Sequence, residues 1–121
     1  MTDVTEKFLK LMSDLKRATI EGRISWEETA DEEEFRAVLK PGMVRVGRHT
    51  AYDANDEATT VFAITLLNQE GRVVEEFVAQ QPASLEPAAE LFELARRTAL
   101  KGEKLLDDFL ADLEKRLVKH L

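Results

Sequence analysis

Residues 59–79 read TTVFAITLLNQEGRVVEEFVA, and their pattern is the strongest indication of a β-sheet in the chain. Its first part, residues 59–67, is rich in Thr, Val, Phe and Ile, which favour β-strands. Asn68 to Gly71 has the composition of a hairpin loop, in which Gly71 suits a left-handed bulge position. Residues 72–79 then complete the pair. The stretch therefore predicts an antiparallel hairpin at the centre of the domain.

Two more strands are expected before this hairpin. Residues 35–40 and 43–48 alternate apolar and polar side chains on either side of a Pro41-Gly42 turn. Residues 27–34 contain six acids and are expected to form a solvated loop, and a polar loop is expected at about residues 49–58. The short connections predict a four-stranded antiparallel meander.

A helix is predicted on each side of the sheet segment. In residues 4–21 an apolar stripe recurs at helical spacing, Asp3 and Glu6 resemble a capping box, and Gly22 ends the element. The second helix spans residues 85–119, with Ser84 as N-cap and Pro87 in the first turn.

One apolar stripe keeps its phase through the whole of residues 85–119. It contains Leu91, Ala95, Thr98, Gly102, Leu105, Leu106, Phe109, Leu113 and Leu117. This continuity predicts one long helix in which Gly102 allows a close backbone approach. The alternative is a break at Lys101-Gly102 between two shorter helices, because glycine within a helix costs ~1 kcal/mol.

These elements predict one α+β domain over residues 1–121, with both helices on one face of the sheet. Aromatic and aliphatic side chains should anchor its core. The expected anchors are Phe8, Trp26, Phe35, Phe62, Ile64, Phe77, Leu91 and Phe92.

Composition narrows the function. The chain has 121 residues, a net charge of −7 and no cysteine, which argues against nucleic-acid binding, disulfides and thiolate metal sites. No apolar run reaches the length of a membrane span, so we expect a cytoplasmic protein without a membrane partner. His49 and His120 are far apart, and Asp53 to Glu57 departs from a calcium loop because Ala58 and Ile64 occupy its glycine and glutamate positions. We expect no catalytic residues, no metal and no cofactor.

The charges are unevenly distributed. Residues 35–52 carry four bases and no acid, namely Arg36, Lys40, Arg45 and Arg48. One interpretation is that these bases balance the neighbouring acidic run. The other is a site for a small anion or an acidic peptide.

The second half of the long helix should overhang the sheet, because 1.5 Å per residue takes the helix to about 50 Å. Its stripe then needs a partner, which predicts a homodimer interface at Leu105, Leu106, Phe109, Leu113 and Leu117. The alternative is cover by the first helix through Phe8, Leu11 and Leu15. The favoured function is a non-enzymatic, self-associating interaction module with a possible further protein partner.

Three short segments carry a resemblance. Residues 18–26 (ATIEGRISW), 91–100 (LFELARRTAL) and 105–110 (LLDDFL) resemble motifs of small bacterial proteins of unknown function. The resemblance implies a helix, a Gly-x-Ile-x-Trp entry, antiparallel strands and a C-terminal helix, and a bacterial cytoplasmic origin, but no activity. The chain also resembles acidic, dimeric type III secretion chaperones in size and charge. A helix usually interrupts their strand series, whereas only residues 68–71 separate the last two strands here.

Overall fold

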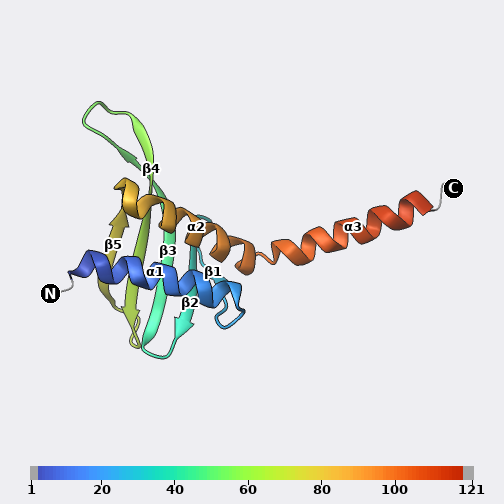
Figure 1. Ribbon diagram of the computed structural model, residues 1–121, viewed down its shortest axis with the longest axis horizontal. Coiled ribbons are helices and arrows are strands. Elements are labelled where there is room, and N and C mark those ends of the chain that lie inside the picture. Colours follow the sequence, from blue (N-terminus) through green and yellow to red (C-terminus); the bar gives the residue numbers. More distant parts are fainter. Residues whose placement is uncertain (1–2, 119–121) are drawn as a thin grey trace.

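The computed structural model describes residues 3–118 and has the expected α+β class, with its strands in one antiparallel sheet (Figure 1). The sheet is a meander in chain order, in which each strand pairs with the next. Its strands are β1 (Glu27–Glu28), β2 (Glu34–Leu39), β3 (Gly42–Tyr52), β4 (Ala58–Asn68) and β5 (Val73–Ala79).

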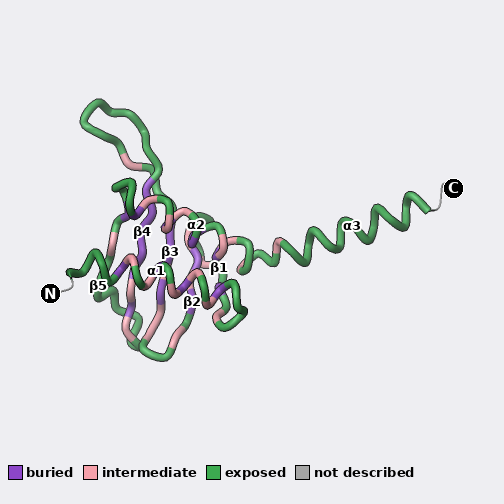
Figure 2. The backbone as a smooth tube through the Cα atoms, in the orientation of Figure 1, coloured by how far each residue is buried: buried purple, intermediate pink, exposed green. Residues whose placement is uncertain are grey.

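Two helices, α1 (Val4–Ile20) and α2 (Pro82–Ala99), lie side by side on one face of the sheet (Figure 1). Asp3 caps α1 by accepting the backbone N–H of Glu6 at 2.8 Å, as the capping pattern predicts. The buried residues of Figure 2 lie between these helices and the sheet. Both helices therefore share one sheet face as expected.

Aromatic rings form the centre of this core. Phe92 of α2 packs against Phe35 and Phe62, with ring centroids 5.6 Å away in each case, and Phe8 lies 5.2 Å from Phe77. Seven of the eight expected anchors are buried, and Phe77 is half-buried at the edge of the cluster.

Trp26 is positioned by a short polar chain within this core. Its indole N–H donates to the Thr19 hydroxyl at 2.9 Å, and that hydroxyl donates to the Leu15 carbonyl at 2.7 Å. Both buried donors are satisfied, so the indole ties the β1 segment to α1.

The sheet has five strands where four were expected. Part of the acidic run forms β1, which pairs with Phe35 and Arg36 of β2. The prediction failed because exposed side chains at a sheet edge stay hydrated while their backbone pairs. The expected loop at 49–58 is also shorter. β3 extends to Tyr52 and β4 begins at Ala58, so a two-stranded arm projects beyond the rest of the sheet (Figure 1).

The prediction of one long helix over 85–119 is wrong, and the alternative, a break at Lys101-Gly102 between two shorter helices, is confirmed. The helical conformation is interrupted after α2, and a third helix, α3, spans Gly102–Val118. Lys101 has φ +56° and stops α2, while the Leu100 N–H still donates to the Arg96 carbonyl. A Cβ at Gly102 would lie 3.7 Å from the Arg97 carbonyl oxygen, an ordinary contact, so Gly102 is no close-packing point. The expected end at Lys119 lies outside the described residues.

The start of α2 also differs from the expectation. The helix begins at Pro82 with Gln81 as its N-cap, and no side chain caps it. Ser84 lies in the first turn, where its hydroxyl donates to the Gln81 carbonyl at 3.1 Å. Pro82 rather than Pro87 therefore fills the early position where a missing N–H costs little.

Candidate interaction surface

The α3 helix projects away from the body formed by the sheet, α1 and α2 (Figure 1). None of its residues is buried, and its main contacts are with the end of α2 (Figure 2). The rest of the described chain therefore contributes little to the stability of α3. Isolated helices of this length are marginal in water.

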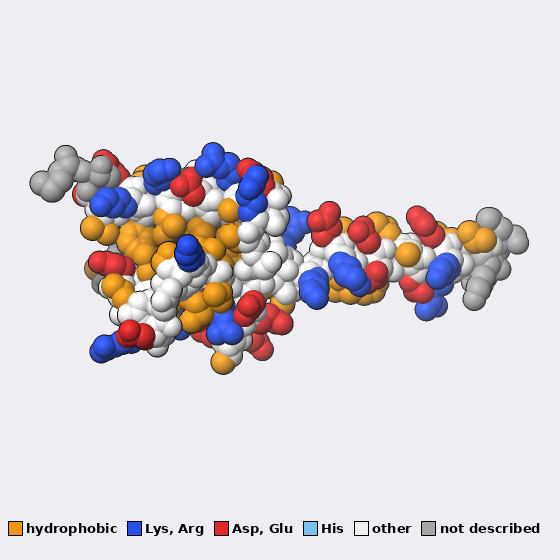
Figure 3. Space-filling model, turned by 90° about the horizontal axis from the view of Figure 1, so that it is seen from below, with side chains coloured by type: hydrophobic (Ala, Val, Ile, Leu, Met, Phe, Trp, Pro, Cys, Tyr) orange, Lys and Arg blue, Asp and Glu red, His pale blue; other side chains and the backbone are white. Residues whose placement is uncertain are grey.

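The predicted apolar stripe of α3 faces solvent. Phe109 is 61% exposed, and Leu105 and Leu113 are more than half exposed. Leu106 and Leu117 complete the predicted set, and they are also exposed. Figure 3 shows hydrophobic side chains at the surface of α3, among charged ones.

Sequence reasoning missed one member of the stripe. Leu110 is half exposed and lies four residues after Leu106 and three before Leu113. That spacing places all three on one helix face, so the signal was present in the pattern.

Cover by the first helix, the alternative for the stripe, does not occur in this structure. Phe8, Met12 and Leu15 of α1 are buried in the core cluster with α2 and the sheet. Leu11 is half-buried against the same cluster. The apolar face of α1 is thus already occupied, and within residues 3–118 no segment of the chain covers the α3 stripe.

Charged residues flank the stripe and pair within the helix. Lys104 and Asp108 lie 3.3 Å apart, and Arg116 and Asp112 lie 2.7 Å apart, each four residues apart in the sequence. Such exposed pairs support a helix by only a few tenths of a kcal/mol each. They form a polar rim and leave the stripe itself uncovered.

A cleft of about 620 Å³ lies at the junction of the body and α3. Its apolar lining includes Ile20 of α1, Leu94 of α2 and Leu106 of α3. Ile20 is 71% exposed, so apolar surface continues from the stripe onto the body.

The predicted basic site is dispersed in the structure. Arg36 and Arg45 are register neighbours on the sheet face opposite the helices, whereas Arg48 lies on the helix side with its guanidinium 4.8 Å from the Phe92 ring centroid. The Lys40 carbonyl accepts the Gln69 side-chain amide in the β2–β3 turn. The four residues therefore do not converge on one anion.

The three arginines pair with the acidic run, as the charge-balance interpretation expects. Arg36 lies 3.2 Å from Glu27, and Arg48 lies 2.6 Å from Glu33. Arg45 is 3.5 Å from Glu34.

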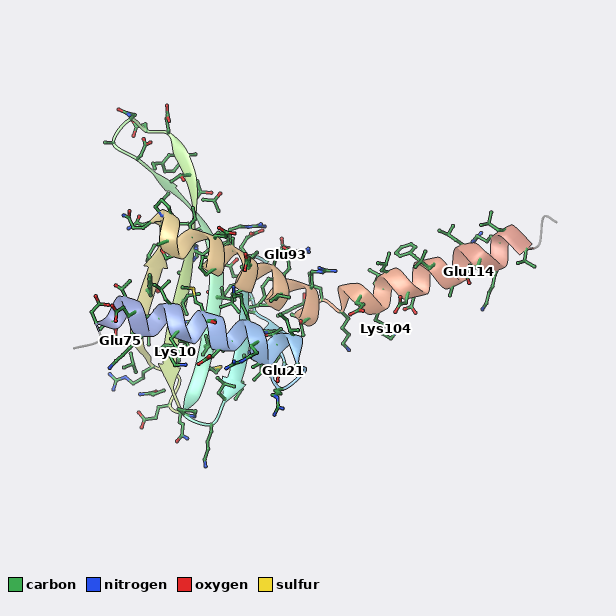
Figure 4. All side chains as sticks on the ribbon, viewed as in Figure 1. Lys10, Glu21, Glu75, Glu93, Lys104 and Glu114 are labelled. Atoms are coloured by element: carbon green, nitrogen blue, oxygen red, sulfur yellow. The ribbon has the colours of Figure 1, made fainter. Side chains whose placement is uncertain are left out.

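Charged residues of β3, α2 and the segment before β2 form a cluster, which contains Arg48, Glu33, Glu93 and Arg96. A hydrogen bond from Arg48 lowers the pKa of the Glu33 carboxyl, and one from Arg96 lowers the pKa of Glu93. Glu93 is labelled in Figure 4 on α2. Within this cluster the Arg48 guanidinium lies over the Phe92 ring.

The tip of the β3–β4 arm is a structural turn. Asp53 accepts the backbone N–H groups of Asn55 at 2.8 Å and Glu57 at 3.0 Å. Within residues 3–118, no group of three or more His, Asp or Glu side chains could hold a metal ion.

A second surface was not foreseen from the sequence. A groove of about 340 Å³ lies between the start of α1, strand β5 and the start of α2. Its lining includes Val4 and Leu9 of α1 together with Phe77 of β5. The only available signal was that β5 comes last in the meander and therefore lies at an edge.

Comparisons with known proteins do not identify a function for these surfaces. No family model, curated protein or solved structure matches the chain. The resemblance to small bacterial proteins therefore stays a prediction. In the described part of the chain, no helix has both the length and the hydrophobicity of a membrane span.

Proposed function

We propose that this protein is a non-enzymatic interaction module that self-associates through α3 as a two-fold dimer. The observation that carries the proposal is the bare apolar stripe of α3, from Leu105 to Leu117. Soluble monomers rarely leave such a contiguous patch in water. A two-fold dimer is the commonest closure, because the same patch then meets its own copy.

The available area agrees with a second copy as the occupant. Six leucine and phenylalanine side chains on α3 are at least half exposed. At roughly 60–120 Å² of apolar surface each, they offer on the order of 500 Å² per chain. A specific interface buries about 800 Å² per partner. The flanking charged residues and the junction cleft beside Ile20 can supply the rest.

An anion or acidic-peptide site at the basic residues is the weaker candidate. Arg36, Arg45 and Arg48 each have a carboxylate partner already. A ligand would have to displace these carboxylates, and no feature of the structure favours that exchange.

Charge substitutions on the stripe test the dimer. The double variant F109K/L113K should shift the protein to a monomer in analytical ultracentrifugation, because four buried lysines would disfavour the two-fold contact. The unfolding midpoint of the body should stay unchanged at low concentration, because neither side chain contacts the core.

The matched control is E57Q/E70Q, which changes the net charge by the same amount in exposed turns of the body, away from α3 and the junction cleft. This control should keep the wild-type mass. A stripe variant that sediments like the wild type, or one that unfolds the body, would contradict the proposal.

A further inference from the structure

Strand β5 is an open edge of the sheet. The sheet order ends at β5, and among residues 3–118 only β4 pairs with it. The opposite edge, β1, has only two residues, whereas β5 has seven. An unpaired strand of this length presents a row of backbone donors and acceptors that another strand can use.

The unforeseen groove runs beside this edge, on the helix side of the sheet. Phe77 of β5 points to that side, where its ring meets Phe8. A strand added to β5 would place the side chain opposite Phe77 on the same side. That side chain would enter the groove between Val4, Leu9 and Ala83.

Two acids at the centre of β5 set the charge of an acceptable partner. Glu75 and Glu76 are exposed, and within residues 3–118 neither has a Lys or Arg nitrogen within 4.0 Å. Among the described side chains, the Glu76 carboxylate accepts a hydrogen bond from the Thr65 hydroxyl alone, at 3.1 Å. Unlike the Arg-paired acids of residues 27–34, these carboxylates are available to a basic partner.

The same acids disfavour a second copy of β5 as the added strand. In an antiparallel two-fold pair centred on this strand, Glu76 would face its own copy or Glu75. Like charges directly opposite each other destabilise a strand pair. Self-association is therefore expected at α3, which lies at the other end of the molecule from Glu75 (Figure 4).

We propose that the β5 edge binds an extended peptide as a sixth strand, with an apolar side chain in the groove beside Phe77 and Lys or Arg side chains opposite Glu75 and Glu76. A peptide that runs antiparallel to residues 74–78 of β5 should have the complementary sequence pattern apolar-apolar-basic-basic-apolar. This surface is separate from α3, so one chain can self-associate and bind such a segment together.

Fluorescent peptides test the proposal. The probe is Thr-Val-Leu-Lys-Lys-Val-Thr, and its matched control replaces both lysines with glutamate. We expect saturable anisotropy changes with a Kd below about 1 mM for the lysine peptide only. Methylation of alternate backbone nitrogens on one edge of the peptide should abolish binding, because strand addition needs those N–H groups.

Protein variants locate the site. E75Q/E76Q should weaken binding roughly threefold to tenfold, since exposed charge pairs are individually weak. A83F should weaken it by filling the groove. D107N/E114Q carries the same charge change on α3 and should bind as the wild type does.

The proposal would be overturned by no binding of the lysine peptide, by equal binding of both peptides, or by equal loss in E75Q/E76Q and D107N/E114Q. The variant F109K/L113K separates this site from the dimer. Its monomer should bind the peptide with the wild-type Kd, whereas loss of binding would place the site on α3 and contradict the assignment to β5.

Discussion

The helices α2 and α3 follow each other in the chain and carry one apolar stripe in continuous phase, yet Leu91 and Ala95 of its α2 part are buried and its α3 part is exposed. Buried residues of α2 include Ala88 and Ala95, whose small side chains let the helix approach the sheet and α1 closely. The stripe of α3 consists of large side chains, and none is buried. An amphipathic stripe therefore shows that a helix needs a partner, but it does not show which surface provides one.

The largest expected difference in stability is between substitutions of Phe92 in α2 and Phe109 in α3. F92A in α2 should lower the free energy of unfolding by about 3–5 kcal/mol, because Phe92 packs on Phe35 and Phe62. F109A in α3 should change monomer stability by less than about 0.5 kcal/mol. Urea unfolding at low protein concentration measures both. A large loss in F109A would show that α3 belongs to the core of its own chain.

At the junction between α2 and α3, the sign of the stability change in K101G tests whether the helix is interrupted. Lys101 has φ +56°, a left-handed conformation that costs a side-chain-bearing residue about 1–2 kcal/mol relative to glycine. K101G should therefore stabilise the protein by roughly 0.5–1 kcal/mol after the entropy cost of glycine. In a continuous helix the same change would instead cost ~1 kcal/mol. Destabilisation in urea unfolding would thus contradict the break between α2 and α3.

The smallest expected effect concerns the charges above Phe92. The pKa of Glu33 is lowered in the folded state by its hydrogen bond from Arg48, so this pair contributes stability above the unfolded-state pKa of about 4.3. That contribution is lost as the pH falls through the lower folded-state pKa. Below about pH 5, the free energy of unfolding of E33Q should therefore fall less steeply with decreasing pH than that of the wild type.

The control for this acid dependence is E103Q, which removes one charge from α3. Chemical unfolding at a series of pH values compares the variants. Identical acid limbs for E33Q and the wild type would show that the Glu33–Arg48 contact does not persist in solution.

The elements with strong periodicity could be predicted from the sequence. The α1 cap, the hairpin turn at residues 68–71 and the aromatic core follow from local patterns and burial. The β1 strand could not be predicted, because two glutamates at an edge look like a loop until their backbone has a neighbour. The β3–β4 arm was missed for the same reason, since among the described strands residues 48–52 of β3 have no neighbour except β4, and residues 58–61 of β4 have none except β3.

The break at Lys101 was the alternative prediction rather than the favoured one. Helical phase continues across residues 100–102, and the residue in the left-handed conformation is a lysine rather than the adjacent glycine. The residues of the α3 stripe were nevertheless identified, with the exception of Leu110, because periodicity depends on the helix and not on its partner. The β5 groove depends on three elements far apart in the sequence, and no local pattern encodes it.

Self-association through α3 is tested most directly by the mass of the wild-type protein in solution, measured by sedimentation equilibrium from low to high micromolar concentration. If a second copy covers α3, the mass should rise to about twice 13.7 kDa, and the unfolding midpoint should rise with concentration. A mass that stays at 13.7 kDa throughout this range would contradict the dimer.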